Sequence, residues 1–283
     1  MINIKIRTST IIVLLTLLFN TAILGQTKTK EKKEYYSNGK LKSILSYGMK
    51  ENGLVFINSE FYFEDGGIQS SDYWTQDKKK HSEKVYTRYY KNRQIKNKYL
   101  ERDGKKEGEE VTYYKNGQIE EISFFKNGKK FGEEKGYFEN GQLRYFSNYL
   151  NDFMNGEERW YFKSGKLNSI SHYNNDIQYG DSKVYYENGQ LSHICNYVNG
   201  LKHGEERRYF ESGKLSGNSF FKNGIITGES RSFYENGKLK SLINYENGKK
   251  IGPEKWYDEN GETIAPPLSP SRTKLKKNQQ KTF

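Results

Sequence analysis

The sequence predicts an all-β protein: an elongated, twisted antiparallel β-meander built from about ten two-stranded units. Three observations support this prediction. A turn dipeptide recurs every 24 residues from Arg93 to Gly261, aromatic residues hold fixed places in each period, and a second turn divides each period in two. A fixed period of this size is typical of an array of repeated supersecondary units.

The last residue of the recurring dipeptide serves as the anchor of each period. The anchors are Gly39, Gly66, Arg93, Gly117, Gly141, Gly165, Gly189, Gly213, Gly237 and Gly261. The first two steps are 27 residues long and the later steps are 24. We therefore expect a repeat array over residues 33–261, preceded by a signal peptide at 1–25 and followed by a basic tail at 262–283.

The composition is unusual for a folded chain. Of the 283 residues, 33% are hydrophobic and 29% are charged, and the mean hydropathy is −1.01. These values alone are typical of disorder. However, 24 tyrosines and 16 phenylalanines recur at fixed places, and aromatic side chains bury a large area on pleated surfaces. We expect a folded protein with a thin core.

The two ends differ from the array. Lys5 and Arg7 precede a short apolar run at 11–19, and a small residue, Gly25, stands before Gln26, which is the pattern of a secretory signal. The protein is therefore expected to be exported, to the periplasm or the medium. The tail combines prolines with basic residues, as a disordered segment does.

The net charge of +12 has two interpretations. It can mark a solvated surface of mixed sign, or an anionic partner such as a membrane surface or a polysaccharide. Nucleic acid is the less favoured partner.

Two turns define each unit. Asn140-Gly141 is one example of the first turn, and Asn127-Gly128 and Asn199-Gly200 are examples of the second. Such dipeptides favour type I′ hairpin turns, in which both central residues have positive φ. The segments between them are about seven residues long, a normal length for a strand.

Alternation along a strand assigns residues to two faces. A tyrosine ladder stands four residues before the anchors, with Lys or Arg six before and Glu or Asp eight before, all on one face. From this face we select as candidate partner-binding residues Tyr137, Tyr161, Tyr185, Tyr209, Arg159 and Arg207. The Phe/Tyr ladder three before the anchors, such as Phe138, and the aliphatics two after them, such as Leu143, are the predicted core.

Trp160 and Trp256 stand five residues before their anchors, in a variable slot. Tryptophan, tyrosine and arginine dominate the energetics of protein interfaces. Both tryptophans are therefore candidate partner-binding residues, and packing within the sheet is the alternative.

The sequence gives little sign of chemistry. Cys195 is the single cysteine, in a slot that holds serine in other units, and His81, His172, His193 and His203 fall in four different slots. We interpret them as surface histidines without zinc-like or triad-like spacing. The repeated Glu residues stand in rows opposite Lys and Arg, as in structural pairing. We predict no catalytic residue, no metal and no cofactor, and hence no enzyme.

The unit Tyr-(Tyr/Phe)-x-Asn-Gly-(Lys/Gln)-Leu, followed by Tyr-x-Asn-Gly-Lys-x-x-Gly-Glu, resembles the variant MORN repeat, with residues 200–205 as its best copy. The resemblance covers roughly residues 33–261 and implies a repeat scaffold. Bacterial arrays of this type are grouped with YwqK-like antitoxins of toxin–antitoxin systems.

Three functions stay open at this point. The first is an exported scaffold that binds a protein partner along its aromatic face. The second is an antitoxin or immunity protein that neutralises a toxin. The third is binding of cell-envelope polysaccharide, with aromatic rings stacking on sugars.

Overall fold

The computed structural model describes residues 29–50, 53–76 and 82–267. Within these ranges 22 strands form an open antiparallel meander, which confirms the predicted fold class. None of the described residues belongs to a helix that is long and apolar enough to cross a membrane. The predicted signal peptide and the tail from residue 268 onwards lie outside the described residues and stay predictions.

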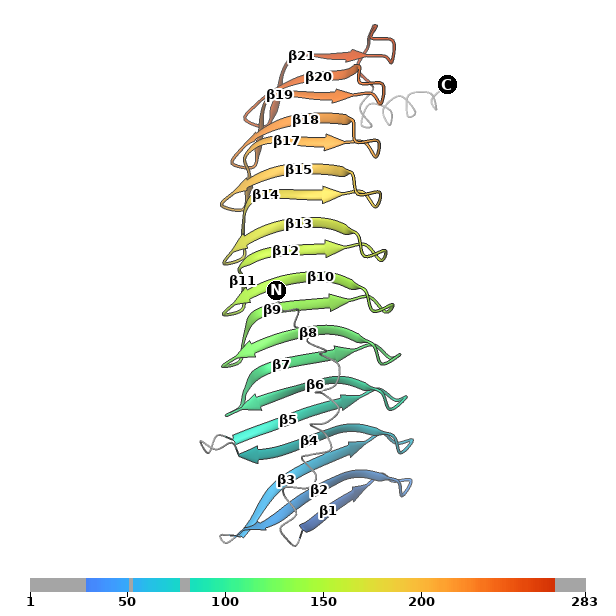
Figure 1. Cartoon of the computed structure of the whole chain (residues 1–283), viewed down its shortest axis with the longest axis vertical. Helices are drawn as coiled ribbons and strands as arrows, with labels where there is room; N and C mark the ends of the chain where they lie inside the picture. Colours follow the sequence, from blue (N-terminus) through green and yellow to red (C-terminus); the bar gives the residue numbers. More distant parts are fainter. Residues whose placement is uncertain (1–28, 51–52, 77–81, 268–283) are drawn as a thin grey trace, which may run out of the picture. The chain divides into compact units, whose positions relative to one another are not determined.

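The chain divides into two compact units between Lys106 and Glu107, a division that the sequence analysis did not predict. Unit 1 holds six complete strands (Figure 1): β1 (Thr29–Tyr35), β2 (Leu41–Lys50), β3 (Gly53–Tyr62), β4 (Ile68–Gln76), β5 (Ser82–Tyr89) and β6 (Ile95–Arg102). The 27-residue steps of the sequence fall in this unit.

Unit 2 continues the meander, with its strands bowed and stacked in sequence order (Figure 1). Its strands are β7 (Lys105–Tyr113), which begins at the boundary, β8 (Ile119–Lys126), β9 (Lys129–Tyr137), β10 (Leu143–Leu150), β11 (Phe153–Met154), β12 (Gly156–Tyr161), β13 (Leu167–Asn174), β14 (Ile177–Tyr185), β15 (Leu191–Val198), β16 (Leu201–Lys202), β17 (Gly204–Tyr209), β18 (Leu215–Lys222), β19 (Ile225–Phe233), β20 (Leu239–Glu246), β21 (Lys249–Tyr257) and β22 (Thr263–Ile264).

The first turn of each unit differs from the predicted type. In the loop that ends at Gly117, the Tyr114 amide donates to the carbonyl of Gln118 at 2.8 Å, and Gly117 alone of the Asn-Gly pair has positive φ, 87°. This is a type I turn followed by a glycine bulge, a three-residue loop. Asn116 Oδ1 accepts a hydrogen bond from the Gln118 amide at 2.9 Å, which explains why asparagine suits this place. The type I′ prediction is wrong here.

The second turn has the predicted type. Asn127 and Gly128 have φ of 53° and 83°, so both central residues are left-handed, as a type I′ turn requires. Asp152 and Asp176 take the glycine place in two units, with φ of 76° and 63°. The structure therefore uses two different turns at its two edges, although the same dipeptide marks both.

Burial in this sheet does not follow the predicted core. Cys195 is the one hydrophobic residue among the buried residues of the described ranges, and its neighbours in the same slot are serines: Ser123 and Ser147 are each 2% exposed and Ser219 is 1% exposed. A single-layer sheet has no opposing layer, so the deepest positions are short side chains covered by long neighbours.

The predicted aromatic core is half-buried and has another role. Tyr114 Oη donates a hydrogen bond to the Tyr137 carbonyl at 2.7 Å, and the same contact joins Tyr186 to the Tyr209 carbonyl. Each of these rings therefore connects a first turn to the following repeat. Phe138 in the same ladder is half-buried as well.

Candidate functional site

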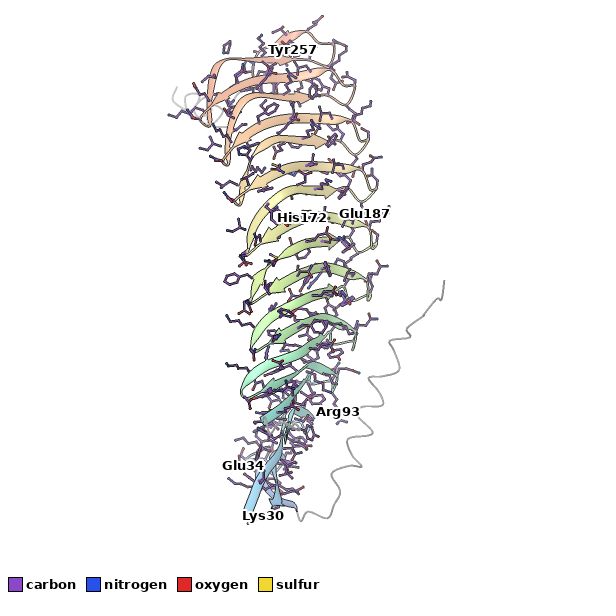
Figure 2. All side chains as sticks on the ribbon, turned by 60° about the vertical axis from the view of Figure 1, so that its left-hand side comes forward. Lys30, Glu34, Arg93, His172, Glu187 and Tyr257 are labelled. Carbon is purple, nitrogen blue, oxygen red and sulfur yellow. The ribbon has the colours of Figure 1, made fainter. Side chains whose placement is uncertain are left out.

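Side chains project from both faces of the strands (Figure 2). The arginine face carries the residues four, six and eight before the anchors, including Arg159, Arg207 and Arg231. The serine face carries the buried slot six after the anchors, which holds Ser123, Ser147, Ser171, Cys195 and Ser219. Consecutive residues of a strand alternate between these faces.

The arginine face brings the predicted Tyr and Arg residues together, and its charges pair internally. Arg207 lies 2.5 Å from Glu205, and Arg159 lies 2.5 Å from Glu157, each two residues away on the same strand. The hydrogen bond from Arg207 lowers the pKa of Glu205. Tyr137, Tyr161, Tyr185 and Tyr209 occupy the same face by alternation.

The serine face buries carboxylates beside lysines. Glu134 is 4% exposed; its carboxylate accepts hydrogen bonds from Ser123 Oγ at 3.0 Å and from Lys130 Nζ. The Lys130 ammonium also lies 5.0 Å from the centre of the Tyr149 ring, so the cation has both an anion and an aromatic face as partners.

Other units fill the same slot without charge. Ser182 replaces the glutamate and lies 3.0 Å from Ser171 Oγ, and Ser230 lies 2.7 Å from Ser219 Oγ. The lysine slot then holds Gln178 or Ile226. Because charged and neutral versions occupy equivalent places, the carboxylates serve packing and pairing within the sheet.

His193 is not a free surface histidine, and this prediction is wrong. Its Nε2 lies 2.9 Å from Glu206 Oε1, and Lys202 binds the same oxygen. Cys195 is fully buried nearby; burial raises the pKa of its thiol, and its Sγ lies 3.5 Å from the Asn196 carbonyl. A buried thiol with a raised pKa is a poor nucleophile, so this group stabilises the sheet.

One row of side chains runs across the strands on the serine face, and the size of its side chains changes abruptly. Each residue of the row is the register partner of the next: Gly136, Tyr145, Trp160, Ser169, Val184, His193, Arg208, Gly217, Ser232, Ser241 and Trp256. Three small residues in succession, Gly217, Ser232 and Ser241, therefore separate Arg208 from Trp256.

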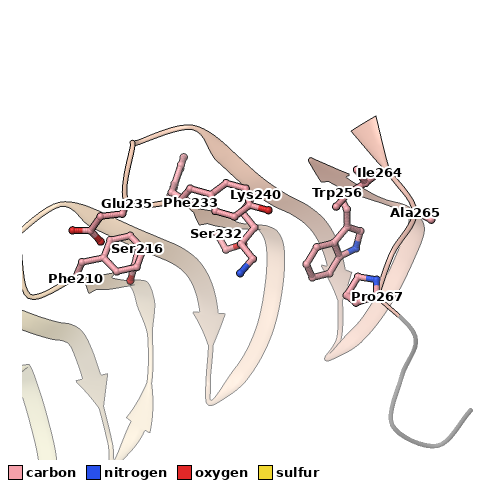
Figure 3. Close-up of a pocket in the computed structure, with 11 residues that line it drawn as sticks. Phe210, Ser216, Ser232, Phe233, Glu235, Lys240, Trp256, Ile264, Ala265 and Pro267 are labelled. Atoms are coloured by element: carbon pink, nitrogen blue, oxygen red, sulfur yellow. The ribbon is translucent and has the colours of Figure 1, made fainter. Parts of the chain in front are cut away.

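Ser232 and Trp256 of this row line an open pocket of about 890 Å³, whose lining residues lie between Phe210 and Pro267 in the sequence. Its aromatic lining includes Phe210, Tyr234 and Trp256. Lys240 and Pro267 also line it (Figure 3). Only glycine fits at position 217 of the sheet, because a Cβ there would lie 2.8 Å from the backbone oxygen of Arg231.

The polar groups of the pocket are held in place. Trp256 Nε1 donates to Glu254 Oε2 at 3.1 Å, which fixes the indole ring. Ser232 Oγ and Ser241 Oγ lie 2.6 Å apart. Lys240 Nζ lies 5.2 Å from the centre of the Tyr234 ring. The pocket thus offers aromatic surfaces, the cation of Lys240 and the carboxylate of Glu235, which is the composition of a site for an apolar group with polar groups beside it.

The structure separates the residues that the sequence analysis grouped as partner-binding. Trp160 and Trp256 lie on the serine face, since Trp160 is adjacent to Arg159 in β12 and its ring centre is 5.0 Å from that of Tyr145. Trp160 is 40% exposed and lies outside the pocket, whereas Trp256 lines it. Gly217, Ser232, Ser241 and Lys240 were missed, although comparison of equivalent slots would have revealed the run of small residues.

The structure is that of a β-repeat protein with a pocket at one end of unit 2. A family model described as "MORN repeat variant" matches residues 28–48, 106–127, 132–151, 154–175, 178–199, 202–223 and 226–247. The chain therefore belongs to the MORN-repeat variant family. The comparison with curated proteins gave no match.

Solved structures show only distant similarity. A porin-like protein from Bacteroides uniformis ATCC 8492 has 10% identity and a TM-score of 0.19, with 80% of this chain and 93% of that chain covered. TcdB2-TccC3 without its hypervariable C-terminal region has 12% identity and a TM-score of 0.22, covering 83% and 17%. A protein of unknown function from Bacteroides fragilis NCTC 9343 has 9% identity and a TM-score of 0.12, covering 62% and 95%. These scores carry no argument about function.

Proposed function

We propose that the protein is a non-enzymatic, exported repeat scaffold that binds a protein partner, and that the Trp256 pocket holds that partner. The observation that supports this most directly is the gap left by three small residues in succession, Gly217, Ser232 and Ser241, next to the pocket that Ser232 and Trp256 line. The gap exposes aromatic surface in a preformed pocket, and such surfaces are typical of interface anchoring sites.

The lining suggests what the partner presents. Phe210, Tyr234 and Trp256 suit an apolar or aromatic side chain. No ion pair of Lys240 is observed among the described residues, and its ammonium rests over an aromatic ring, so it is placed to meet a carboxylate. We infer a partner segment in which an aromatic or aliphatic residue stands close to Asp or Glu.

Capture of partners from the source envelope fraction and medium tests this proposal. Trp256→Ala removes the anchor, and Ser232→Val fills the pocket with the residue that Val184 provides at the equivalent slot. Both variants should lose a stoichiometric partner that the wild-type chain retains, at least tenfold. Thr112→Val, the same slot in β7, is the matched control and should bind as the wild type does. Equal capture by all four proteins would refute the pocket as the site.

The antitoxin role is a specific form of this proposal, in which the partner is a toxin. It predicts that deletion of the gene is toxic and that the captured partner is the toxic protein. If the partner is not toxic, or if deletion strains are viable, the scaffold proposal stands and the antitoxin role is excluded.

Polysaccharide binding is the second candidate, because Trp160 offers an exposed ring on the same face as Trp256. It predicts retention on cell-wall polysaccharide that Trp160→Ala weakens. Unchanged retention of that variant would count against it.

Export has a separate test. The protein purified from its source should begin after Gly25. An N-terminal sequence that still starts at Met1 would contradict a cleaved signal.

A further inference from the structure

The arginine face of unit 2 carries an exposed apolar patch along the edge where the second turns lie. Four strands that follow second turns, β11, β14, β16 and β19, each begin with an apolar residue that is about half exposed. These residues are Phe153 (49%), Ile177 (51%), Leu201 (48%) and Ile225 (50%). Leu150 and Val198, the register partners of Phe153 and Leu201, are exposed beside them. We call these six residues the edge patch.

The edge patch is continuous because its aliphatic side chains contact the glycine of the next second turn. A Cβ on Gly224 would lie 3.4 Å from Leu201 Cδ2, and one on Gly248 would lie 3.4 Å from Ile225 Cγ2. In other units the same slot holds Lys105, Lys129 or Lys249. A charged residue is therefore compatible with this place in the fold, and packing of the turn does not require the apolar residues.

A second set of exposed apolar residues lies on the same face, at the third residue of strands that follow second turns. Phe131, Tyr179 and Ile251 are 43–46% exposed. With about 200 Å² for a large apolar side chain, these nine residues offer on the order of 800 Å². This area is what one partner contributes to a standard protein interface, and it exceeds the usual patch on a monomer.

Seven of the nine apolar residues are arranged symmetrically about one strand. Val198 in β15 lies midway between Ile177 in β14 and Leu201 in β16, with Phe153 and Ile225 further out on either side. Phe131 and Ile251 lie beyond these two, in β9 and β21. A two-fold axis through Val198 would therefore place Ile177 opposite Leu201, Phe153 opposite Ile225 and Phe131 opposite Ile251, whereas Leu150 would lie opposite Glu246 and Tyr179 opposite His203.

We propose that the edge patch is the interface with a second copy of this chain, with the two arrays antiparallel and Val198 on the two-fold axis. The equal spacing of the units lets Ile177 of one copy meet Leu201 of the other, Phe153 meet Ile225, and Phe131 meet Ile251. The Trp256 pocket opens on the opposite face and stays accessible in each copy.

Mass measurement by light scattering or sedimentation at about 1–100 µM tests the association. The full chain should be a dimer. Ile177→Lys with Leu201→Lys introduces the residue that other units carry in this slot, and should give a folded monomer with an unchanged circular dichroism spectrum. Ile119→Lys changes an exposed apolar residue away from the patch and should stay dimeric. A monomeric wild type, or a dimeric double-lysine variant, overturns the proposal.

Cross-linking tests the register. In a Cys195→Ser background, Val198→Cys should form a disulfide-linked dimer under mild oxidation. Leu150→Cys occupies the equivalent slot two units away and should not. Cross-linking of both variants would indicate parallel arrays, and cross-linking of neither would place the contact elsewhere; either result contradicts the proposed interface.

Discussion

At the residue scale, Glu206 shows how this sheet buries a charge without a second layer. The residue is 5% exposed, yet its carboxylate has His193 at 2.9 Å, Lys202 on the same oxygen and Arg208 at 3.8 Å from the other. The hydrogen bond from His193, followed by that from Lys202, lowers the pKa of Glu206 from 4.5 to about 2. Because the pKa is below that of a free glutamate, folding favours the ionised form of this carboxyl.

A lowered carboxylate pKa gives stability that is fully present above pH 4.5 and is lost as the pH falls through about 2. We expect Glu206→Gln to lower the free energy of unfolding by about 2–3 kcal/mol at pH 7. The difference between variant and wild type should shrink between pH 5 and pH 2, because protonation neutralises the native carboxyl as well. Urea unfolding at several pH values measures this, and a difference independent of pH would contradict it.

The residues of the site show why prediction from sequence was partial. Comparison of slots drew attention to Trp256 as an aromatic residue in a variable place, and this residue lines the pocket. The pocket itself lies beside a run of small residues, Gly217, Ser232 and Ser241, and small residues carry no individual signal in the sequence. Face assignment by alternation was sound for Tyr137 and Arg159, but the set of candidate partner-binding residues combined them with Trp160, which is on the other face.

At the element scale, the turns explain departures from the repeat. Asp152 replaces glycine at a left-handed position, with φ of 76°, and its Oδ1 accepts a hydrogen bond from the Lys130 amide at 2.8 Å. The Asp152 amide in turn donates to the Lys130 carbonyl at 3.0 Å. The Asp152 side chain thus connects one hairpin to the previous one, and its hydrogen bond offsets the backbone strain of the positive φ. The sequence predicted both turns from one dipeptide, whereas loop length and this bonding decide the turn type.

The same substitution should therefore have different effects at two turns. Arg93 has φ of 70° in an exposed loop, so Arg93→Gly should stabilise the protein by about 0.5–1 kcal/mol through relief of backbone strain. Asp152→Gly relieves similar strain but loses a hydrogen bond of about 1 kcal/mol, so its net effect should be close to zero. Denaturant unfolding compares the two; an equal gain at both sites would show that the Asp152 bond contributes nothing.

At the scale of the whole molecule, repeats contact mainly their neighbours, and the hydrophobic residues do not gather in one core. In such arrays stability is approximately a sum of unit and neighbour terms. The 24-residue period was sufficient to predict the meander, because every unit repeats the same local information. The division into two units was not predicted, since the 27-residue steps look like ordinary insertions in the sequence.

The most direct test of this account is partner capture by two deletion variants. Removal of residues 142–165 takes out one full period and joins Gly141 to Lys166, so strand direction, faces and the Trp256 pocket are all preserved. Removal of residues 142–153 takes out half a period and reverses the direction of every later strand. The full-period variant should keep the circular dichroism of a β-sheet and capture the partner as the wild type does, and the half-period variant should lose both. Loss of folding or of capture in both variants alike would contradict a modular array with a local binding site.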